Sequence, residues 1–104
     1  MVGRGEVWWA ELADVGRRPV LVLTREEVVD ALTSVLVATI TTRRRDIPTE
    51  VALDADDGMP RPCVVSLDNL ATERKAHLVE RITRLGPERM HEVCRALARA
   101  TGCG

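Results

Sequence analysis

Short aliphatic runs separated by glycine, proline and charged residues dominate the chain, and this pattern is typical of a small β protein. Stretches rich in β-branched side chains fit the pleated surface of a sheet. The expected strands are residues 5–12, 19–23, 35–41, 49–53, 63–67 and 78–85, with 69–74 continuing the fifth strand. That continuation is expected to follow a bend at Asp68. Because only a short turn separates the first two strands, we expect them to form an antiparallel hairpin.

One convincing helix is expected near the end of the chain. Pro87 after Gly86 suits the first helical position, and Gly102 is placed to stop the helix. Its apolar face is expected to comprise Met90, Val93, Cys94, Leu97, Ala98 and Thr101. A shorter helical turn is expected after residue 24, because Thr24 and Glu27 match a capping box.

The fold class that follows is mainly β (α+β), a small antiparallel barrel with short helices and a C-terminal α-helix. The length of 104 residues argues for one domain over residues 1–104. Trp8 and Trp9 are the only aromatic residues, so the core must be aliphatic. The same scarcity excludes a platform of several stacked aromatics for nucleic-acid bases.

Charge is balanced overall but locally uneven. The net charge of −1 gives no global basic signature, whereas Arg17 and Arg18 stand at the start of the second strand and residues 43–45 are all arginine. A local basic patch suits a small anionic target more than extended wrapping of DNA, and the guanidinium fork is well suited to phosphate. Three widely spaced cysteines indicate no disulfide framework and favour the cytoplasm. We expect no signal peptide and no membrane span.

Several motifs follow one another in order along the chain. They are RGEVWW at 4–9, RPVLVL at 18–23, VATIT at 37–41, IPTEV at 47–51, CVVSLDNL at 63–70, ERK at 73–75 and ITRL at 82–85. In order and spacing they resemble the MazF/PemK/Kid toxins of bacterial toxin–antitoxin modules. The resemblance extends from Arg4 to about Ala98. One such motif alone would be weak, but the ordered series is specific.

The resemblance implies an SH3-like barrel of the CcdB/Kid/MazF type, a homodimer, and a toxin that is a sequence-specific, metal-independent endoribonuclease. Such an enzyme would cleave single-stranded RNA by 2′-hydroxyl attack, leaving 2′,3′-cyclic phosphate and 5′-hydroxyl ends. It implies catalytic roles for Arg18 and Thr41, a cognate antitoxin whose disordered tail lies across the dimer, and no cofactor or metal. Residues expected to contact RNA are Arg17, Thr42, Arg43, Arg44, Asp68 and Asn69.

Each catalytic assignment has a plainer alternative that the residues alone leave open. Arg18 can be a surface arginine paired with Asp14 or Glu11. Thr41 can be an ordinary strand threonine, present for its β-propensity. The resemblance favours the catalytic interpretation of both. Since arginine is normally too basic to donate a proton, we expect Arg18 to act mainly by charge stabilisation.

The predicted RNA contacts have alternatives as well. The arginines at 43–45 can hold flanking phosphates or form a solvated loop balanced by nearby acids. Asn69 can read a base edge, and an Asp–Asn pair suits a turn equally well. A nuclease that uses His77 and His91 is disfavoured. His91 is expected to be packed beside the apolar helix face or at a dimer contact, and Cys94 is expected in the core.

Two departures from the family pattern limit what the resemblance implies. The loop before Arg18 is cut to about residues 13–17, so a relative's RNA sequence preference does not transfer. Cys63 stands where serine is frequent. The alternative functions are a DNA gyrase poison of the CcdB kind, which depends on its C-terminal end, and an SH3-like binding module without activity.

Overall fold

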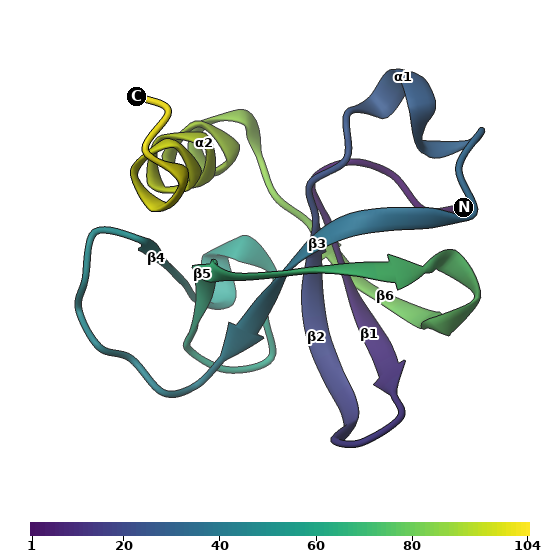
Figure 1. Cartoon of the computed structure of the whole chain (residues 1–104). Helices are drawn as coiled ribbons and strands as arrows, with labels where there is room; N and C mark the ends of the chain where they lie inside the picture. Colours follow the sequence, from purple (N-terminus) through teal and green to yellow (C-terminus); the bar gives the residue numbers. More distant parts are fainter.

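An antiparallel sheet of six strands forms the body of the computed structural model, which describes residues 1–104. The strands are β1 (Glu6–Leu12), β2 (Gly16–Val22), β3 (Ser34–Thr41), β4 (Glu50–Leu53), β5 (Cys63–Arg74) and β6 (Leu78–Arg84). Their order in the sheet is β4-β5-β3-β2-β1-β6, and every neighbouring pair is antiparallel. The sheet curls strongly (Figure 1), which confirms the predicted mainly β class and the first hairpin.

Two α-helices and two 3-10 turns complete the chain. They are α1 (Glu26–Val29), η1 (Ala55–Asp57), η2 (Lys75–His77) and α2 (Pro87–Thr101). As predicted, α2 begins at Pro87, and Gly102 ends it in the left-handed conformation with φ of 72°. Helix α2 packs on β5 and β4, while α1 lies toward the other end of the molecule (Figure 1). No helix is long and apolar enough to cross a membrane.

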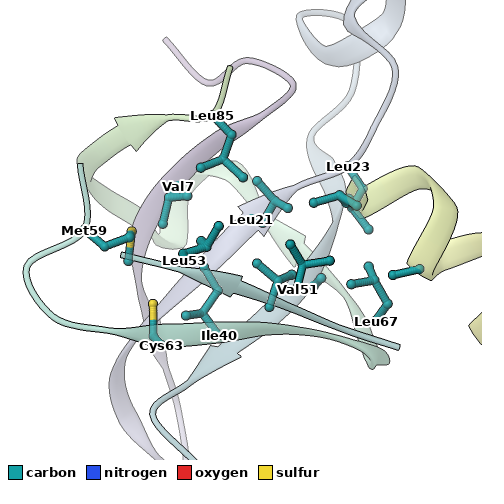
Figure 2. Packing of buried hydrophobic residues seen from close by; sticks show 14 residues of the cluster. Val7, Leu21, Leu23, Ile40, Val51, Leu53, Met59, Cys63, Leu67 and Leu85 are labelled. Atoms are coloured by element: carbon teal, nitrogen blue, oxygen red, sulfur yellow. The ribbon is translucent and has the colours of Figure 1, made fainter. Parts of the chain in front are cut away.

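The aliphatic residues of β2 divide between two buried clusters. Leu21, and Leu23 just after the strand, join a cluster of 14 buried residues that includes side chains from α2 (Figure 2). Val20 and Val22 point to the opposite face and join a cluster of 7 that includes a side chain from α1. Strand β2 is therefore buried on both faces, as its continuous aliphatic run predicts. The buried half of the strand is therefore a rigid support for Arg17 and Arg18, which lie at its beginning.

The predicted capping box at Thr24 is wrong. The Thr24 hydroxyl oxygen accepts the backbone N–H of Leu36 at 2.7 Å, so it pairs with β3 instead of the helix. Arg25 takes the N-cap position of α1 without a side-chain hydrogen bond. A long-range contact thus overrides the local capping signal, and α1 is held by its buried Val29.

The apolar face of α2 is partly as predicted: Met90, Val93 and Leu97 pack on the core, together with Ala96 and Ala100, which were not predicted. Val93 and Ala96 are buried, whereas Cys94 is exposed and receives a hydrogen bond from Arg4 at 3.4 Å. The prediction that Cys94 is a core residue is therefore wrong, and His91 is exposed instead of packed, which leaves a dimer contact as the remaining prediction for it. The small side chain of Ala96 is buried in the large cluster, where α2 meets the sheet. Cys94, two residues earlier on the helix, therefore points toward solvent.

The connector between β4 and β5, residues 54–62, is fixed to two other elements. A capping box between Asp54 and Asp57 closes η1. Arg89 of α2 donates two hydrogen bonds to the Asp57 carboxylate, both of 3.0 Å. Thr83 of β6 donates its hydroxyl to the Asp57 carbonyl at 2.8 Å. Asp57 therefore ties the connector to both α2 and β6.

The contact with Arg89 changes the acidity of Asp57. Burial raises the pKa of this carboxyl, but the hydrogen bonds from Arg89 and from the backbone of Asp54 outweigh burial and hold the pKa below its ordinary 3.8. A carboxylate with a depressed folded-state pKa stabilises the fold above the unfolded-state pKa. That contribution is lost as the pH falls through the lower, folded-state value.

We expect Asp57→Asn to lower the free energy of unfolding by about 1–3 kcal/mol at pH 7, because a charged hydrogen-bond partner of Arg89 is lost. The difference from the wild type should persist down to the ordinary pKa of 3.8 and shrink below it. Urea unfolding at a series of pH values measures this difference. A difference that is already absent at pH 7, or that grows in acid, would contradict the assignment.

Candidate functional site

Arg18 and Thr41, the two residues predicted to be catalytic, lie at the end of the sheet where the pairing of β2 with β3 stops. The paired residues of the two strands are Val20–Thr39, Leu21–Ala38 and Val22–Val37. Arg18 and Thr41 each lie two residues beyond the Val20–Thr39 pair, where Arg18 pairs with Ala10 of β1 and Thr41 with Val64 of β5. The buried ladder thus brings the two side chains to the same end of the sheet.

Both side chains line one cavity of about 730 Å³. Thr42 lines it too, and the rest of the lining is Trp9, Leu12, Val15, Pro19, Thr39, Ile40, Met59, Pro60, Arg61 and Cys63. The lining contains two arginines, Arg18 and Arg61, and no acidic residue. Because the whole chain has a net charge of −1, this local excess of positive charge favours an anionic ligand.

The guanidinium of Arg18 is not neutralised by an acid. Its Nη1 donates to the Arg17 carbonyl at 3.0 Å, and it forms no ion pair. The alternative in which Arg18 pairs with Asp14 or Glu11 is therefore not observed. The exposed fork keeps donors available for a ligand in the cavity.

The hydroxyl of Thr41 is oriented by the loop that follows it. Its oxygen accepts the backbone N–H of Arg43 at 3.1 Å, a local contact that is common where a threonine starts a turn. With one acceptor site of the oxygen occupied, the hydroxyl hydrogen remains available for donation. Thr41 is exposed, so a ligand in the cavity can reach it.

Arg17 lies beside the cavity but has partners of its own. Its guanidinium pairs with Glu80 of β6 and lies over the Trp9 ring, 5.4 Å from the centroid. Trp9 in turn lines the cavity. Arg17 therefore supports the cavity wall through a cation–π contact.

The arginine loop after Thr41 is partly balanced by acids. Arg44 pairs with Asp46 at 2.5 Å and Arg45 pairs with Glu50 at 3.2 Å, whereas the Arg43 side chain has no ion pair. Burial raises the pKa of Glu50, but hydrogen bonds from Arg45 outweigh it and lower the pKa below 4.5. Neither Arg43 nor Arg44 lines the cavity.

Asp68 and Asn69 lie in a bulge of β5 away from the cavity lining. Consecutive residues of β3 pair with Ser66 and Leu70, which leaves 67–69 unpaired and confirms the bend predicted at Asp68. Asp68 accepts the Thr49 hydroxyl at 2.5 Å, and the Asn69 amide donates to the Ser66 hydroxyl at 3.1 Å. The structure does not bring these two residues together with Arg18.

A second wall of the cavity comes from the β4–β5 connector, which sequence reasoning treated only as a turn. Met59, Pro60 and Arg61 from the connector line the cavity together with Cys63. Burial, and secondarily the charge of Asp57, raises the pKa of the Cys63 thiol above 9.0, so the thiol is neutral at pH 7. The only sequence signal for this wall is the pair of prolines around Arg61, which restrict its backbone. Neither histidine lines the cavity.

Comparison with known proteins adds independent information. Residues 3–101 match the family described as PemK-like, MazF-like toxin of type II toxin–antitoxin system. The chain is 45% identical over 101 residues to a probable endoribonuclease MazF2 of Mycobacterium tuberculosis, covering 96% of this chain and 98% of the relative.

Solved structures agree with the sequence match. The toxin MazF-mt6 of M. tuberculosis superposes with a TM-score of 0.87 at 38% identity, covering 95% of this chain and 98% of that one. A mycobacterial endoribonuclease solved in complex with its cognate antitoxin gives a TM-score of 0.91 at 30% identity, covering 100% and 98%. The predicted fold class is thereby confirmed. Sequence and fold together show that this chain belongs to the PemK-like, MazF-like toxin family of type II toxin–antitoxin systems.

Proposed function

We propose that this protein is an endoribonuclease toxin that cuts single-stranded RNA within the cavity between β2, β3 and the connector. The observation that carries the proposal is that Arg18 and Thr41 line one cavity that has no acidic residue in its lining. A phosphodiester is the anion that such a cavity suits. Membership of a family that includes named endoribonucleases supports the same assignment.

In the proposed reaction the substrate's 2′-hydroxyl oxygen attacks the adjacent phosphorus. The bond from phosphorus to the 5′-oxygen breaks, which gives a 2′,3′-cyclic phosphate and a 5′-hydroxyl. Negative charge accumulates on the phosphoryl oxygens in the transition state. Arg18 stabilises this charge with its guanidinium donors, and the Thr41 hydroxyl donates a hydrogen bond to a phosphoryl oxygen.

Proton transfer in this reaction is assigned to water. No imidazole lines the cavity, and the raised pKa of Cys63 keeps its thiol protonated at neutral pH. Water accepts the 2′-hydroxyl proton and supplies a proton to the departing 5′-oxygen. The chain's contribution is therefore positioning and charge stabilisation. Since the nucleophile belongs to the RNA, we propose a reaction that needs neither metal nor cofactor.

Residues around the cavity are assigned to the flanking nucleotides. Thr42 lines the cavity, and the unpaired side chain of Arg43 follows it, so both are placed to hold a phosphate beside the scissile one. Arg17 and Arg44 would contact RNA only by giving up an acidic partner. Base contacts by Asp68 and Asn69 stay a prediction, which requires the RNA to extend from the cavity to the β5 bulge.

The proposal includes the setting in which the toxin acts. We propose a cytoplasmic protein, folded as one domain, that works as a homodimer and is inhibited by a cognate antitoxin. The mycobacterial relative solved with its cognate antitoxin supports the last point. Leu36 and Leu70 are exposed hydrophobic residues on β3 and β5, which is consistent with a surface that another chain covers.

We expect the purified protein to cut a long single-stranded RNA in EDTA, leaving cyclic-phosphate ends. Arg18→Ala should lower kcat/KM by about 100-fold to 1,000-fold, because a charged donor to the transition state is lost. Arg17→Ala should lose less, since its guanidinium is already held by Glu80 and Trp9. Fragment mapping by primer extension, with end-group analysis, measures both effects.

Folding of each variant is checked by circular dichroism before assay. Intact RNA at high concentrations of wild-type protein, or equal activity of the wild type and Arg18→Ala, would rule out this reaction. Intact RNA accompanied by trapped complexes of gyrase with cleaved DNA would instead support a gyrase poison.

The donor role of Thr41 predicts a contrast between two substitutions. Thr41→Ser keeps the hydroxyl and should retain activity within about 10-fold, whereas the isosteric Thr41→Val should lose about 100-fold. Thr72→Val, at another exposed strand threonine that does not line the cavity, is the matched control. Single-turnover cleavage rates compare the three. Comparable rates for Thr41→Val and Thr72→Val would show that the hydroxyl plays no part.

A further inference from the structure

We infer that Arg61 is a second substrate-binding arginine, which holds an RNA phosphate next to the scissile one, and that the Asp57–Arg89 pair positions it. The inference rests on the proposed function of the cavity. It gives a role in RNA binding to the connector wall of the cavity, which takes no part in the reaction proposed for Arg18 and Thr41.

Arg61 is free to bind an anion. It is exposed, and its guanidinium has no ion pair and no side-chain hydrogen bond, unlike Arg17, Arg44 and Arg45. It lines the cavity that also contains Arg18, with no acid between the two walls. Two arginines in one cavity repel each other unless an anion lies between them. Their shared cavity is thus suited to a ligand with more than one negative charge.

The backbone at Arg61 is constrained on both sides. Pro60 and Pro62 fix their own φ angles, and Pro62 also restricts the conformation of Arg61 before it. Met59 is only 6% exposed and packs in the large cluster, where its sulfur lies at the same end as that of Cys63 (Figure 2). The residue that carries the guanidinium therefore loses little backbone entropy when it binds.

The connector is also held by contacts with β6 and α2, neither of which lines the cavity. At Gly58 the backbone has φ of 87°, and a Cβ would lie 2.4 Å from the Thr83 hydroxyl oxygen, so β6 and the connector meet closely there. Asp57, the residue before it, receives the two hydrogen bonds from Arg89 of α2. Arg89 keeps its place through a further 2.9 Å contact with Glu92. A helix outside the cavity thereby sets the position of one cavity wall.

These contacts give the two walls different roles. The β2–β3 wall presents Arg18 and Thr41 to the reacting phosphate, and the connector wall presents Arg61 to a neighbouring one. The inferred contact of Arg61 is to a phosphate whose charge does not change during the reaction, so we assign it to uniform binding, equal in the ground state and the transition state. Loss of Arg61 should accordingly raise KM and leave kcat nearly unchanged.

The test uses an RNA oligonucleotide with a 2′-deoxy nucleotide at the cleavage site, so that binding is measured without cleavage. Fluorescence anisotropy over a range of salt gives the dissociation constant and its salt dependence. For Arg61→Ala we expect a Kd at least 10-fold higher and a slope of log K against log salt that is smaller by about 0.7, the value for one phosphate contact on a single strand. Arg61→Lys should keep the slope, because the charge remains.

Arg74→Ala is the matched control, since Arg74 is exposed, unpaired and outside the cavity lining. Equal slopes and Kd values for Arg61→Ala and Arg74→Ala would overturn the inference, as would a fall in kcat with unchanged KM for Arg61→Ala. The proposed function would survive that result if Arg18→Ala still lowered kcat/KM by the predicted factor of at least about 100. Failure of the wild type both to bind and to cleave RNA would overturn both.

The positioning pair is tested separately with Arg89→Met and Arg89→Lys. Arg89→Met should raise Kd but leave the salt slope at the wild-type value, because Arg61 still reaches the phosphate from a less ordered connector. Arg89→Lys, which can still donate to Asp57, should restore part of the affinity. A wild-type Kd for a folded Arg89→Met would show that the pair has no part in positioning Arg61.

Discussion

The antiparallel pairing of β2 with β3 is the constraint on which the candidate site depends. Val20 and Val22 are buried on one face of β2, and Leu21 and Leu23 on the other, so a shift of register would expose one set or the other. The register that burial enforces also brings Arg18 and Thr41, each two residues beyond the last pair, to the same end of the sheet and into one cavity. The chemistry is therefore placed by the hydrophobic effect, acting on residues that do not contact the ligand.

The second wall of the cavity depends on polar contacts. The connector contributes one side chain to the large cluster, Met59, and is otherwise held by hydrogen bonds between Asp57 and its partners Arg89 and Thr83. Bidentate contacts of this kind are directional, so they fix orientation as well as distance. The β2–β3 wall of the cavity is therefore held by apolar packing, whereas the position of the connector wall depends on its contacts with α2. The arrangement couples the terminal helix to the cavity without placing a helix residue in it.

The strands, the terminal helix and the bend in β5 could be predicted from sequence because each has a local cause, such as a β-branched run, Pro87 after Gly86, or Asp68. The predictions that failed are those decided by tertiary contacts. Thr24 bonds to β3 instead of capping a helix, and packing against the sheet turns Cys94 outward. Arg61 was missed because its distance from Arg18 in the sequence carries no sign that the folded chain brings both to one cavity.

The claim that Arg18 and Thr41 act on one phosphate is tested most directly by a double-mutant cycle. Single-turnover cleavage is measured for the wild type, Arg18→Ala, Thr41→Val and the double variant. Residues that stabilise the same transition-state charge act as a unit, so the double variant should be no more than about threefold slower than the slower single variant. If the rate loss of the double variant equals the product of the losses of the two single variants, the account is contradicted, because the two residues then act independently.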